Sequence, residues 1–587
     1  MATQNKPAMA DIPTALAAGT RVRRLQIGCW LGLIAIAVVR AWFTRYELTP
    51  DSMSYLDIAR AVAEGHPHAA LNAYWSPGYP VLISPFLRLF RPNAYWEFPL
   101  VHAVNLLIFV GTLASFQLFW REASQWHRNY AEGQAAEISE DAFWALGYAV
   151  FGIAILNIIT VGVVGPDLMT SAFVFLAGWS ALLFRRTPGF GRALLLGIVL
   201  ALGYYAKAPF FPMAAIFVVC AFWQWPLRPR LFLLAGTAAV TFLLVCGPLV
   251  IALSRANNRL TFGDSARMSQ AFYVNGVQYY RHWQGGPPGS GTPIHPTRML
   301  NEFPRIYEFA AKDMGTYPPW YVPTYWYAGI LPHPDLRRQA ALFIRNLALE
   351  FQIIMESGTA LVLIVILLAL LTGFRKRWIQ GLSQLWFVWV SGAVALLMFA
   401  LIHVERRFLG GWLVMLFAGA VCACRLPSDV GTRRAVRCIG AAMLIAAAAA
   451  VLLQASREAI GIDHAYGRSS QEASIAAGLL RNGLSPGDPI ALIDDGTGAY
   501  WAHLARLHVI AEIPAGNGGH LSALDFWESG PEVQQRALGI LERTGAKAVI
   551  AGSPEDFLGA EAPSILPPPW KRIDGTGSYI YFFHADR

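Results

Sequence analysis

The sequence predicts a polytopic α-helical membrane protein, with about eleven transmembrane helices and a small α/β domain at its C-terminal end. The 587 residues are 55% hydrophobic and only 14% charged, which is too apolar and too poor in charge for a soluble protein of this length. Long apolar runs recur from residue 25 to residue 457. Beyond them, short β-rich runs alternate with amphipathic helices.

Apolar runs of membrane-spanning length define the predicted helices. The first, Leu25 to Thr44, has about the 20 residues needed to cross a hydrocarbon layer ~30 Å thick, and no small-residue cleavage site follows it. We therefore interpret it as a retained helix and not as a signal peptide. The further runs lie near residues 98–120, 141–162, 168–184, 193–209, 211–225, 231–253, 351–374, 379–402, 409–424 and 438–455.

Basic residues in the short loops predict the orientation in the membrane. They gather in alternate loops, so these loops share one face, and by the positive-inside rule this face is cytoplasmic. The residues are Arg21, Arg23, Arg24, Arg185, Arg186, Arg192, Arg228, Arg230, Arg375, Lys376, Arg377, Arg425, Arg433, Arg434 and Arg437. The net charge of +9 therefore reflects topology and does not indicate nucleic-acid binding.

This orientation divides the chain into three parts. We expect a cytoplasmic N-terminal segment at 1–24, a transmembrane domain at 25–457 and an exported soluble α/β domain at 458–587. Two long loops of the transmembrane domain, 45–97 and 254–350, also fall on the exported side. None of the six cysteines lies in these exported parts, so they cannot use disulfide bonds for stability.

The C-terminal segment carries four β-rich runs. A helix between the second and third runs is predicted to start at Pro531 and to end at Gly545, which is the usual asymmetry of helix ends. The stretch "DDGTGAY" after the first run lacks the third glycine of a nucleotide fingerprint, so a lid, acceptor-docking or assembly role is favoured over nucleotide binding. The four runs cover 489–494, 507–513, 547–552 and 579–585.

The first exported loop starts with an acid in the first turn of a predicted helix, "ELTPDSMSYLDIARAVAEG" (47–65). The preceding threonine can cap this helix, the proline suits its first position, and Asp51 meets the positive end of the helix dipole. Capping alone would explain Asp51. The rest of the helix is expected to lie along the membrane surface, with Asp57, Arg60 and Glu64 toward water.

A second acid is predicted to reach the same exported face. Asp167 lies in a very short turn between the third and fourth spans, in "VGVVGPDLMTSAF". A charge at membrane depth is costly, so an acid kept there is a functional candidate, although a cap at a helix start avoids most of that cost. For Asp167, capping and function remain equal alternatives.

Positive groups arrive at this face from later spans. Lys207 ends the fifth span in "GYYAKAP", and His403, Arg406 and Arg407 occupy the turn "LIHVERRFLGG" between the ninth and tenth spans. Such groups suit a phosphate, because arginine offers a planar fork to phosphate oxygens. The alternative is that Glu405 pairs with one arginine while the others extend to lipid headgroups.

Two acids and several cations on one exported face suit the transfer of a group from a lipid phosphate to a hydroxyl. One carboxylate would take the proton of the acceptor, and the cations would stabilise the leaving phosphate. The rival hypotheses are a lipid or polysaccharide transporter, for which no clear internal repeat is found, and a non-catalytic assembly or sensor protein that acts through its C-terminal domain.

The motifs that carry these residues resemble those of the GT-C fold, the multi-spanning glycosyltransferases that use lipid-phosphate sugars. They are "SMSYLDIARAVAEG", "WSPGYPVLISPFL", "GPDLMTSAFVFLAG", "LGYYAKAPF" and "HVERRFLGGWLVML". The resemblance covers roughly residues 25 to 425. It is nearest to bacterial relatives of protein O-mannosyltransferases, lipid A aminoarabinose transferases and rhizobial lipopolysaccharide galacturonosyltransferases.

The resemblance implies an enzyme that transfers a sugar from a polyprenyl-phosphate donor, with inversion, at the outer face of a bacterial inner membrane. The acceptor would be a lipid, a polysaccharide or a protein of the cell envelope. Asp51 would be the general base and Asp167 would help to orient the acceptor. The donor phosphate would bind Lys207 and the turn from His403 to Arg407, including Arg406. No cofactor is expected.

Two positions depart from the family pattern. The chain has Arg407-Phe408 and then Gly410-Gly411 where the family often has Arg-Tyr and then a proline. The first-loop acid is often followed by a second acid, but here Ser52 follows it. Donor contacts near Phe408 are therefore expected to differ, and we expect no metal site.

The second exported loop contains an aromatic cluster, "YPPWYVPTYWYAG". Sugar rings stack on aromatic side chains, so Trp320 and Tyr321, together with Tyr55 of the first loop, are candidate substrate contacts. An interfacial aromatic belt is the simpler account and the one we favour. The cluster comprises Tyr317, Trp320, Tyr321, Tyr325, Trp326 and Tyr327.

Overall fold

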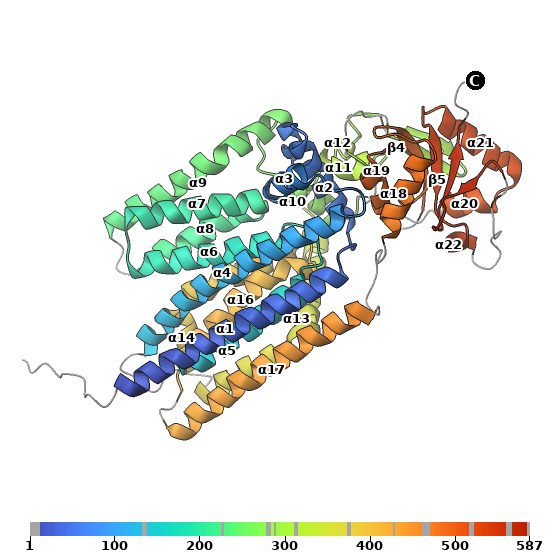
Figure 1. The fold of residues 1–587 in the computed structure, drawn as a ribbon. Helices are drawn as coiled ribbons and strands as arrows, with labels where there is room; N and C mark the ends of the chain where they lie inside the picture. The colour runs from blue at the N-terminus through green and yellow to red at the C-terminus, as the bar shows by residue number, and fades with distance from the viewer. Residues whose placement is uncertain are drawn as a thin grey trace, which may run out of the picture.

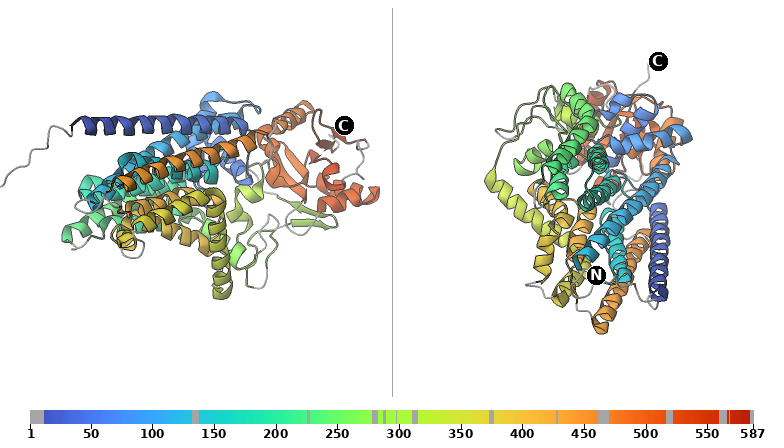
Figure 2. Two further views of the ribbon diagram at one scale, coloured as in Figure 1. Left: turned by 90° about the horizontal axis from the view of Figure 1, so that it is seen from below. Right: turned by 90° about the vertical axis from the view of Figure 1, so that its left-hand side faces the viewer.

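The computed structural model is an elongated bundle of membrane-sized helices with a smaller α/β region at one end (Figure 1). Figure 2 shows the same arrangement from two other sides. The residues described are 12–131, 138–224, 228–277, 283–286, 289–296, 298–309, 315–372, 377–426, 429–460, 470–515, 522–558, 566 and 568–583.

A helix lies at each of the predicted spans, which confirms a polytopic helical membrane protein. Among the described residues, seven helices are long and apolar enough to cross a membrane, and α7, α8 and α15 are shorter apolar helices. The helices of the bundle are α1 (Ile12–Phe43), α4 (Glu97–Ala131), α5 (Glu140–Phe151) continued by the π-helix η2 (Gly152–Ile159), α6 (Asp167–Arg186), α7 (Phe190–Ala206), α8 (Phe210–Phe222), α9 (Pro229–Ala256), α13 (Leu336–Thr372), α14 (Ile379–Gln384), α15 (Trp386–Ile402), α16 (Arg406–Cys422) and α17 (Val430–Ile460).

Two of the predicted spans are interrupted in the structure. Helix α13 breaks at Gly358, where the backbone is non-helical (φ −147°, ψ 29°), and part of it runs across the bundle in the left view of Figure 2. The predicted span at 379–402 is divided at Leu385 into α14 and α15. Hydropathy reports length and composition but not direction, so it could not reveal either break.

Short helices follow α1 at the end of the bundle near the α/β region: α2 (Pro50–Ala63), η1 (Pro67–Ala70) and α3 (Gly78–Phe90). The expectation that Asp57 and Arg60 of α2 face water is wrong. The Asp57 side chain is 8% exposed and accepts hydrogen bonds from the backbone N–H and the hydroxyl of Thr316, at 2.7 and 2.8 Å. Arg60 forms an ion pair with Glu97. The polar side of α2 is covered because other parts of the chain pack on it.

The loop between α9 and α13 folds into short elements: α10 (Ser265–Ser269), the π-helix η3 (Gln270–Val274), β1 (Arg298–Glu302), β2 (Arg305–Glu308), α11 (Pro318–Tyr321) and α12 (Pro323–Trp326). The favoured interpretation of its aromatic cluster as an interfacial belt is wrong. Tyr317, Tyr321, Trp326 and Tyr327 are buried, and the Tyr317 hydroxyl donates to Glu512 at 3.0 Å. These rings pack between the bundle and the α/β region and do not face lipid.

The α/β region is built on a seven-stranded sheet with the order β1-β2-β4-β3-β5-β7-β6. Strand β3 pairs in parallel with β4 and β5, and the other pairs are antiparallel. The C-terminal strands are β3 (Pro489–Asp494), β4 (His508–Pro514), β5 (Ala548–Ala551), β6 (Lys571–Arg572) and β7 (Tyr579–Phe582). All four predicted β-rich runs form strands, although residues 584 and 585 lie outside the described residues. The sequence assigned β1 and β2 to a loop.

The two faces of this sheet belong to two different hydrophobic cores. Because side chains alternate along a strand, Ile490 and Leu492 of β3 join the core that is continuous with the bundle, whereas Ala491 and Ile493 join a separate core. Helices α18 (Gln471–Arg481) and α19 (Tyr500–Ala505) contribute to the first core, and α20 (Ser522–Glu528) and α21 (Pro531–Glu542) to the second. The α/β region is thereby packed directly onto the bundle.

Candidate active site

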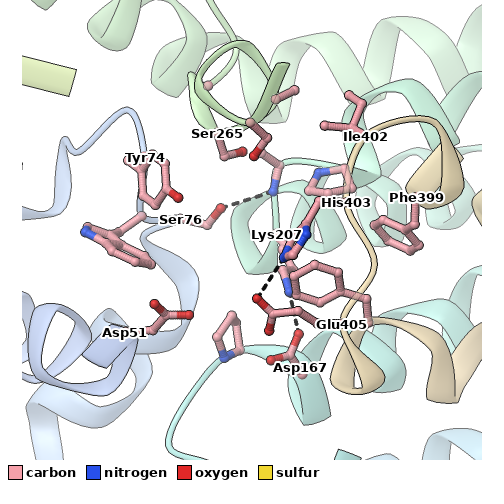
Figure 3. Close-up of a pocket in the computed structure, with 18 of the residues that line it drawn as sticks. Asp51, Tyr74, Ser76, Asp167, Lys207, Ser265, Phe399, Ile402, His403 and Glu405 are labelled. Atoms are coloured by element: carbon pink, nitrogen blue, oxygen red, sulfur yellow. Dashed lines mark hydrogen bonds and ion pairs between the residues drawn. The ribbon is translucent and has the colours of Figure 1, made fainter. Parts of the chain in front are cut away.

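A cavity of about 260 Å³ lies where the starts of α2 and α6, the α7–α8 turn and the α15–α16 turn meet. It is lined by seven of the nine site residues that the sequence nominates (Figure 3). These are Asp51, Tyr55, Asp167, Lys207, Trp320, His403 and Arg407. Residues up to 356 positions apart in sequence therefore meet in one cavity.

Asp51 is held at the cavity by the start of α2. Pro50 occupies the first helical position, and the Ser52 hydroxyl accepts a hydrogen bond from the Thr49 backbone N–H at 2.9 Å, as in a capping box. The Asp51 carboxylate forms an ion pair with Arg407 of α16. The helix start therefore fixes the carboxylate, and Asp51 has a charge partner that capping alone does not explain.

Asp167 occupies the first turn of α6 and is buried. Its Oδ1 accepts from the Lys207 ammonium at 2.5 Å, and its Oδ2 lies 3.8 Å from Nε of Arg407. Among the described residues, this Oδ2 has no hydrogen-bond partner, which is unusual for a buried oxygen. This oxygen is itself enclosed by protein atoms, so Asp167 meets the cavity as a buried carboxylate that is held by Lys207 and lies close to Arg407.

Arg407 is the centre of the cluster because it contacts three carboxylates. Besides Asp51 and Asp167, its Nε donates to Glu405 at 2.6 Å. Burial by itself would raise the pKa of Glu405, but the hydrogen bond from His403 and the charge of Arg407 lower this pKa below its usual value. Glu405 is therefore ionised, and Arg407 is held by anions on three sides.

The glycine pair after Arg407 sets the position of α16. A Cβ atom on Gly410 would lie 2.6 Å from the carbonyl oxygen of Ala154 in η2, and one on Gly411 would lie 2.9 Å from the Ser171 hydroxyl in α6. Both substitutions would force the helices apart. These glycines allow α16 to approach η2 and α6 closely, which places Arg407 next to Asp167.

Aromatic rings hold the cations on the other side of the cavity. The Lys207 ammonium lies 3.9 Å from the ring centre of Phe408, a cation–π contact. The His403 imidazole stacks on Tyr273 of η3 with ring centres 4.1 Å apart, and its Nε2 lies 3.1 Å from Glu405. Phe408 thus contacts the lysine through its ring, and a difference in donor contacts near Phe408 stays a prediction.

Part of the cavity wall is aromatic. Tyr55, Trp75 and Trp320 contact one another edge-on, with Tyr55 to Trp75 at 5.2 Å and Trp75 to Trp320 at 5.7 Å between ring centres. The Trp75 indole N–H donates to the Trp320 carbonyl oxygen at 3.0 Å. Burial and then the charge of Asp51 raise the pKa of Tyr55 well above its usual value, so Tyr55 is a neutral phenol.

Two of the nominated residues lie outside the cavity lining. Arg406 turns away from the cavity and bonds Glu356 and Ser357 of α13. Glu405 pairs with Arg407, as the alternative for this turn proposed for one arginine. Tyr321 packs on Gly315, where a Cβ atom would lie 2.6 Å from the ring, and Gly315 has the positive φ (+67°) that favours glycine. Neither residue touches the cavity in this structure.

Several lining residues were not nominated from the sequence. Tyr74, Trp75 and Ser76 come from the first loop, and Ser265, Ser269 and Tyr273 come from α10 and η3. The run "YWSPGYP" combines aromatic and hydroxyl residues in a loop that the sequence predicts to be exported, and this signal could have identified the first three. Within the described residues, no group of three or more His, Cys, Asp or Glu is arranged to hold a metal ion.

The chain has the fold of the GT-C membrane enzymes, as the sequence motifs predicted. No family model and no curated protein sequence matches the chain. Among solved structures, ArnT from Cupriavidus metallidurans in the apo state has the same fold, with a TM-score of 0.50 and 12% identity over 94% of this chain and 97% of ArnT.

Two further solved structures give weaker matches. ArnT from the same organism bound to undecaprenyl phosphate has a TM-score of 0.48 and 13% identity, over 93% of this chain and 96% of that chain. The Archaeoglobus fulgidus oligosaccharyltransferase, tethered to an acceptor peptide, has a TM-score of 0.45 and 12% identity, over 90% of this chain and 69% of that chain.

Proposed function

We propose that this protein is a membrane glycosyltransferase that moves a sugar from a polyprenyl-phosphate donor to an acceptor hydroxyl of the cell envelope. The observation that carries the proposal is the meeting of Asp51, Asp167, Lys207 and Arg407 in one cavity. The fold shared with ArnT, a lipid A aminoarabinose transferase, supports the same class of reaction. The acceptor would be a lipid, a polysaccharide or a protein.

Donor binding would exchange the partners of the cations. In this structure, Lys207 pairs with Asp167, and Arg407 pairs with Asp51. A phosphate that enters would compete for both cations, because charge-assisted bonds from Lys and Arg to phosphate are strong. The Asp51 carboxylate would then lose its arginine and become free to accept a proton.

The proposed step is a single displacement with inversion at the anomeric carbon. The acceptor oxygen forms a bond to this carbon, the bond from the carbon to the phosphate oxygen breaks, and the acceptor proton passes to Asp51. The bond electrons leave with polyprenyl phosphate, whose added negative charge is stabilised by Lys207, Arg407 and an N–H group of His403. Asp167 keeps Lys207 in place, and its carboxylate would help to orient the acceptor.

The aromatic wall would bind the sugar. Tyr55 and Trp320 line the same cavity as the ion pairs, so a sugar ring could stack on an aromatic ring while its phosphate meets the cations. The polyprenyl chain would extend among the apolar residues that line the remainder of the cavity, such as Phe399 and Ile402.

The proposed location is a bacterial cytoplasmic membrane, with the N-terminus in the cytoplasm and the α/β region exported. The distribution of basic loop residues supports this orientation. The site would then face the exported side, where a lipid-linked donor can meet envelope acceptors. A transporter is disfavoured because its polar sites are expected near the middle of the bilayer, whereas these charges lie at helix ends.

The substitution Asp51→Asn tests the proposal most directly. Loss of a general base is expected to lower the transfer rate by about 10²–10⁴-fold, with the protein still folded. The measurement compares envelope glycolipids by mass spectrometry in a deletion strain complemented with wild-type or variant protein, where wild type restores one sugar and the variant does not.

The matched control is Asp335→Asn. Asp335 also caps a helix, since its carboxylate accepts from the Arg338 backbone N–H at 3.0 Å, but it does not line the cavity. This control should restore the glycan fully. Restoration by Asp51→Asn at normal yield would show that Asp51 is not the base.

A further inference from the structure

We propose that a second cleft, at the other end of α2, binds the phosphate group of an anionic membrane lipid. The cleft has a volume of about 420 Å³, enough for roughly a dozen water molecules at about 30 Å³ each. It lies between the end of α2, the end of α3, the start of α4 and the end of α19. Its charged lining is Arg60, Glu64, Arg88, Arg91, Glu97 and Arg506.

The charges of this cleft do not cancel. Arg60 forms an ion pair with Glu97, and Nη1 of Arg506 lies 3.4 Å from Glu64. Among the residues that the structure describes, Arg88 and Arg91 have no carboxylate partner. Four arginines face two glutamates, so the cleft carries two positive charges in excess and favours an anion.

Arg88 and Arg91 are arranged to act on one ligand. Arg88 lies in the last turn of α3 and Arg91 directly follows the helix, and both line the cleft. Arg91 ends the helix in a left-handed conformation (φ 43°, ψ 57°), which turns the chain back toward α4. Two guanidinium groups on one side of a cleft match the several oxygens of a phosphate.

Exposed apolar side chains place this cleft at the membrane surface. Leu89 and Phe90 lie between the two arginines in sequence and are 75% and 61% exposed. The turn that follows carries Tyr95 and Trp96, both exposed, directly before the membrane helix α4 begins at Glu97. Tyrosine and tryptophan at the start of a span are typical of the headgroup level of a bilayer.

The exposed apolar side chains beside the cleft indicate whether the bound phosphate belongs to a lipid or is free in solution. A soluble phosphate would need only the arginines, whereas a lipid also needs apolar surface beside them for its chains. The exposed leucine and phenylalanine supply that surface without any cover from the described residues. The ligand is therefore a lipid with a net negative phosphate headgroup.

The lipid would also join two parts of the chain. Arg506 belongs to the α/β region, whereas Arg88 and Arg91 belong to α3. A phosphate that contacts both groups would hold the α/β region against the bundle, at the opposite end of the helix that carries Asp51.

The experiment measures thermal unfolding of the purified full chain in detergent with added lipid. Phosphatidylglycerol is expected to raise the Tm by several degrees, because a ligand that binds only the folded state stabilises it. Phosphatidylcholine, which has no net charge, and inorganic phosphate at the same concentration should leave the Tm unchanged. The double variant Arg88→Gln/Arg91→Gln should lose the response, and Arg88→Lys/Arg91→Lys should keep part of it.

The control is Arg536→Gln/Arg543→Gln, which removes two exposed arginines from the region of α21 and should respond to phosphatidylglycerol like wild type. An equal Tm shift with inorganic phosphate would overturn the assignment to a lipid. A full phosphatidylglycerol response in the Arg88→Gln/Arg91→Gln protein would overturn the site itself. Without lipid, the Arg88→Gln/Arg91→Gln and Arg536→Gln/Arg543→Gln proteins should both unfold at the wild-type Tm, since neither arginine pair has an ion-pair partner among the described residues.

Discussion

Two clusters of buried charge lie along α2, and they differ in how completely their atoms are paired. Near its start, Asp51 and Asp167 share Arg407, Oδ2 of Asp167 lacks a hydrogen-bond partner among the described residues, and a cavity adjoins the group. Further along, His503 of the α/β region is bonded on both ring nitrogens, to Asp57 at 2.5 Å and to Glu97 at 2.7 Å.

The difference distinguishes a site from a structural contact. The His503 cluster joins α2, α4 and α19, and none of its carboxylate or imidazole atoms is left without a partner in the part of the chain described. Such a network holds two regions together and has no group to offer a ligand. In the Arg407 cluster, by contrast, one carboxylate oxygen has no hydrogen-bond partner among the described residues, and a cavity adjoins the cluster. These properties are expected of a group that exchanges partners with a ligand.

Loss of Arg407 should have the largest effect. Arg407→Ala leaves Asp51, Asp167 and Glu405 without their shared cation, so we expect a loss of transfer by at least about 10²-fold together with a destabilisation of about 3–5 kcal/mol. Glycolipid mass spectrometry and thermal unfolding in detergent measure the two effects. The neighbouring Arg406→Ala, outside the cavity, should show neither, and equal effects of both variants would contradict the assignment.

Breaking the second cluster should affect stability alone. His503→Gln removes a cation between two buried carboxylates, which is expected to cost about 3–5 kcal/mol. The expected signs are a lower Tm and faster proteolytic release of the α/β region. The transfer rate of the protein that remains folded should stay within a few-fold of wild type. Loss of transfer at unchanged stability would assign His503 to the site instead.

The smallest effect is expected from pH. Burial and Arg60 lower the pKa of His503, but the charge of Glu97 and the hydrogen bonds that the ring donates to Asp57 and Glu97 outweigh them and raise this pKa above its usual value. A raised pKa in the folded state stabilises the protein fully below about pH 6.5, and this contribution is lost as pH rises through the folded pKa.

The measurement is the Tm difference between wild type and His503→Gln over a pH series. This difference should be largest in acid and shrink in alkali. The control is His68→Gln, an exposed histidine of η1, for which the difference from wild type should not change with pH. A wild-type advantage that grew with pH would show that His503 is neutral in the folded protein.

The sequence predicted the Arg407 cluster at the cavity better than it predicted the His503 cluster. Asp51, Asp167, Lys207 and Arg407 sit at span ends, and loop charges assign each span end to a face, so their meeting follows from topology. The pairing of Asp57 with His503 joins residues 446 positions apart in two regions, and neither hydropathy nor spacing carries that information. On an isolated helix, Asp57 belongs to a polar side that would face water.

The orientation of single side chains was also beyond the sequence. Arg406 and Arg407 are adjacent and chemically the same, yet a helix start sends one to the cavity and the other to Glu356. Trp320 and Tyr321 are likewise adjacent in the short helix α11, yet only Trp320 lines the cavity. Aromatic residues make up 13% of the chain, so the partners Tyr273 and Trp75 could not be singled out by type.

The antiparallel pair β1–β2 has a consequence for biosynthesis. It joins the sheet through β4, so a segment made before α13 pairs with one made after α17. About 200 residues separate Glu308 from His508, and at 5–20 residues per second the ribosome needs roughly 10–40 seconds to make them. The newly made β1–β2 segment must therefore wait, with its edge unpaired, while helices α13 to α17 of the bundle are made. A factor that shields exposed strand edges during translation would protect the β1–β2 segment during this interval.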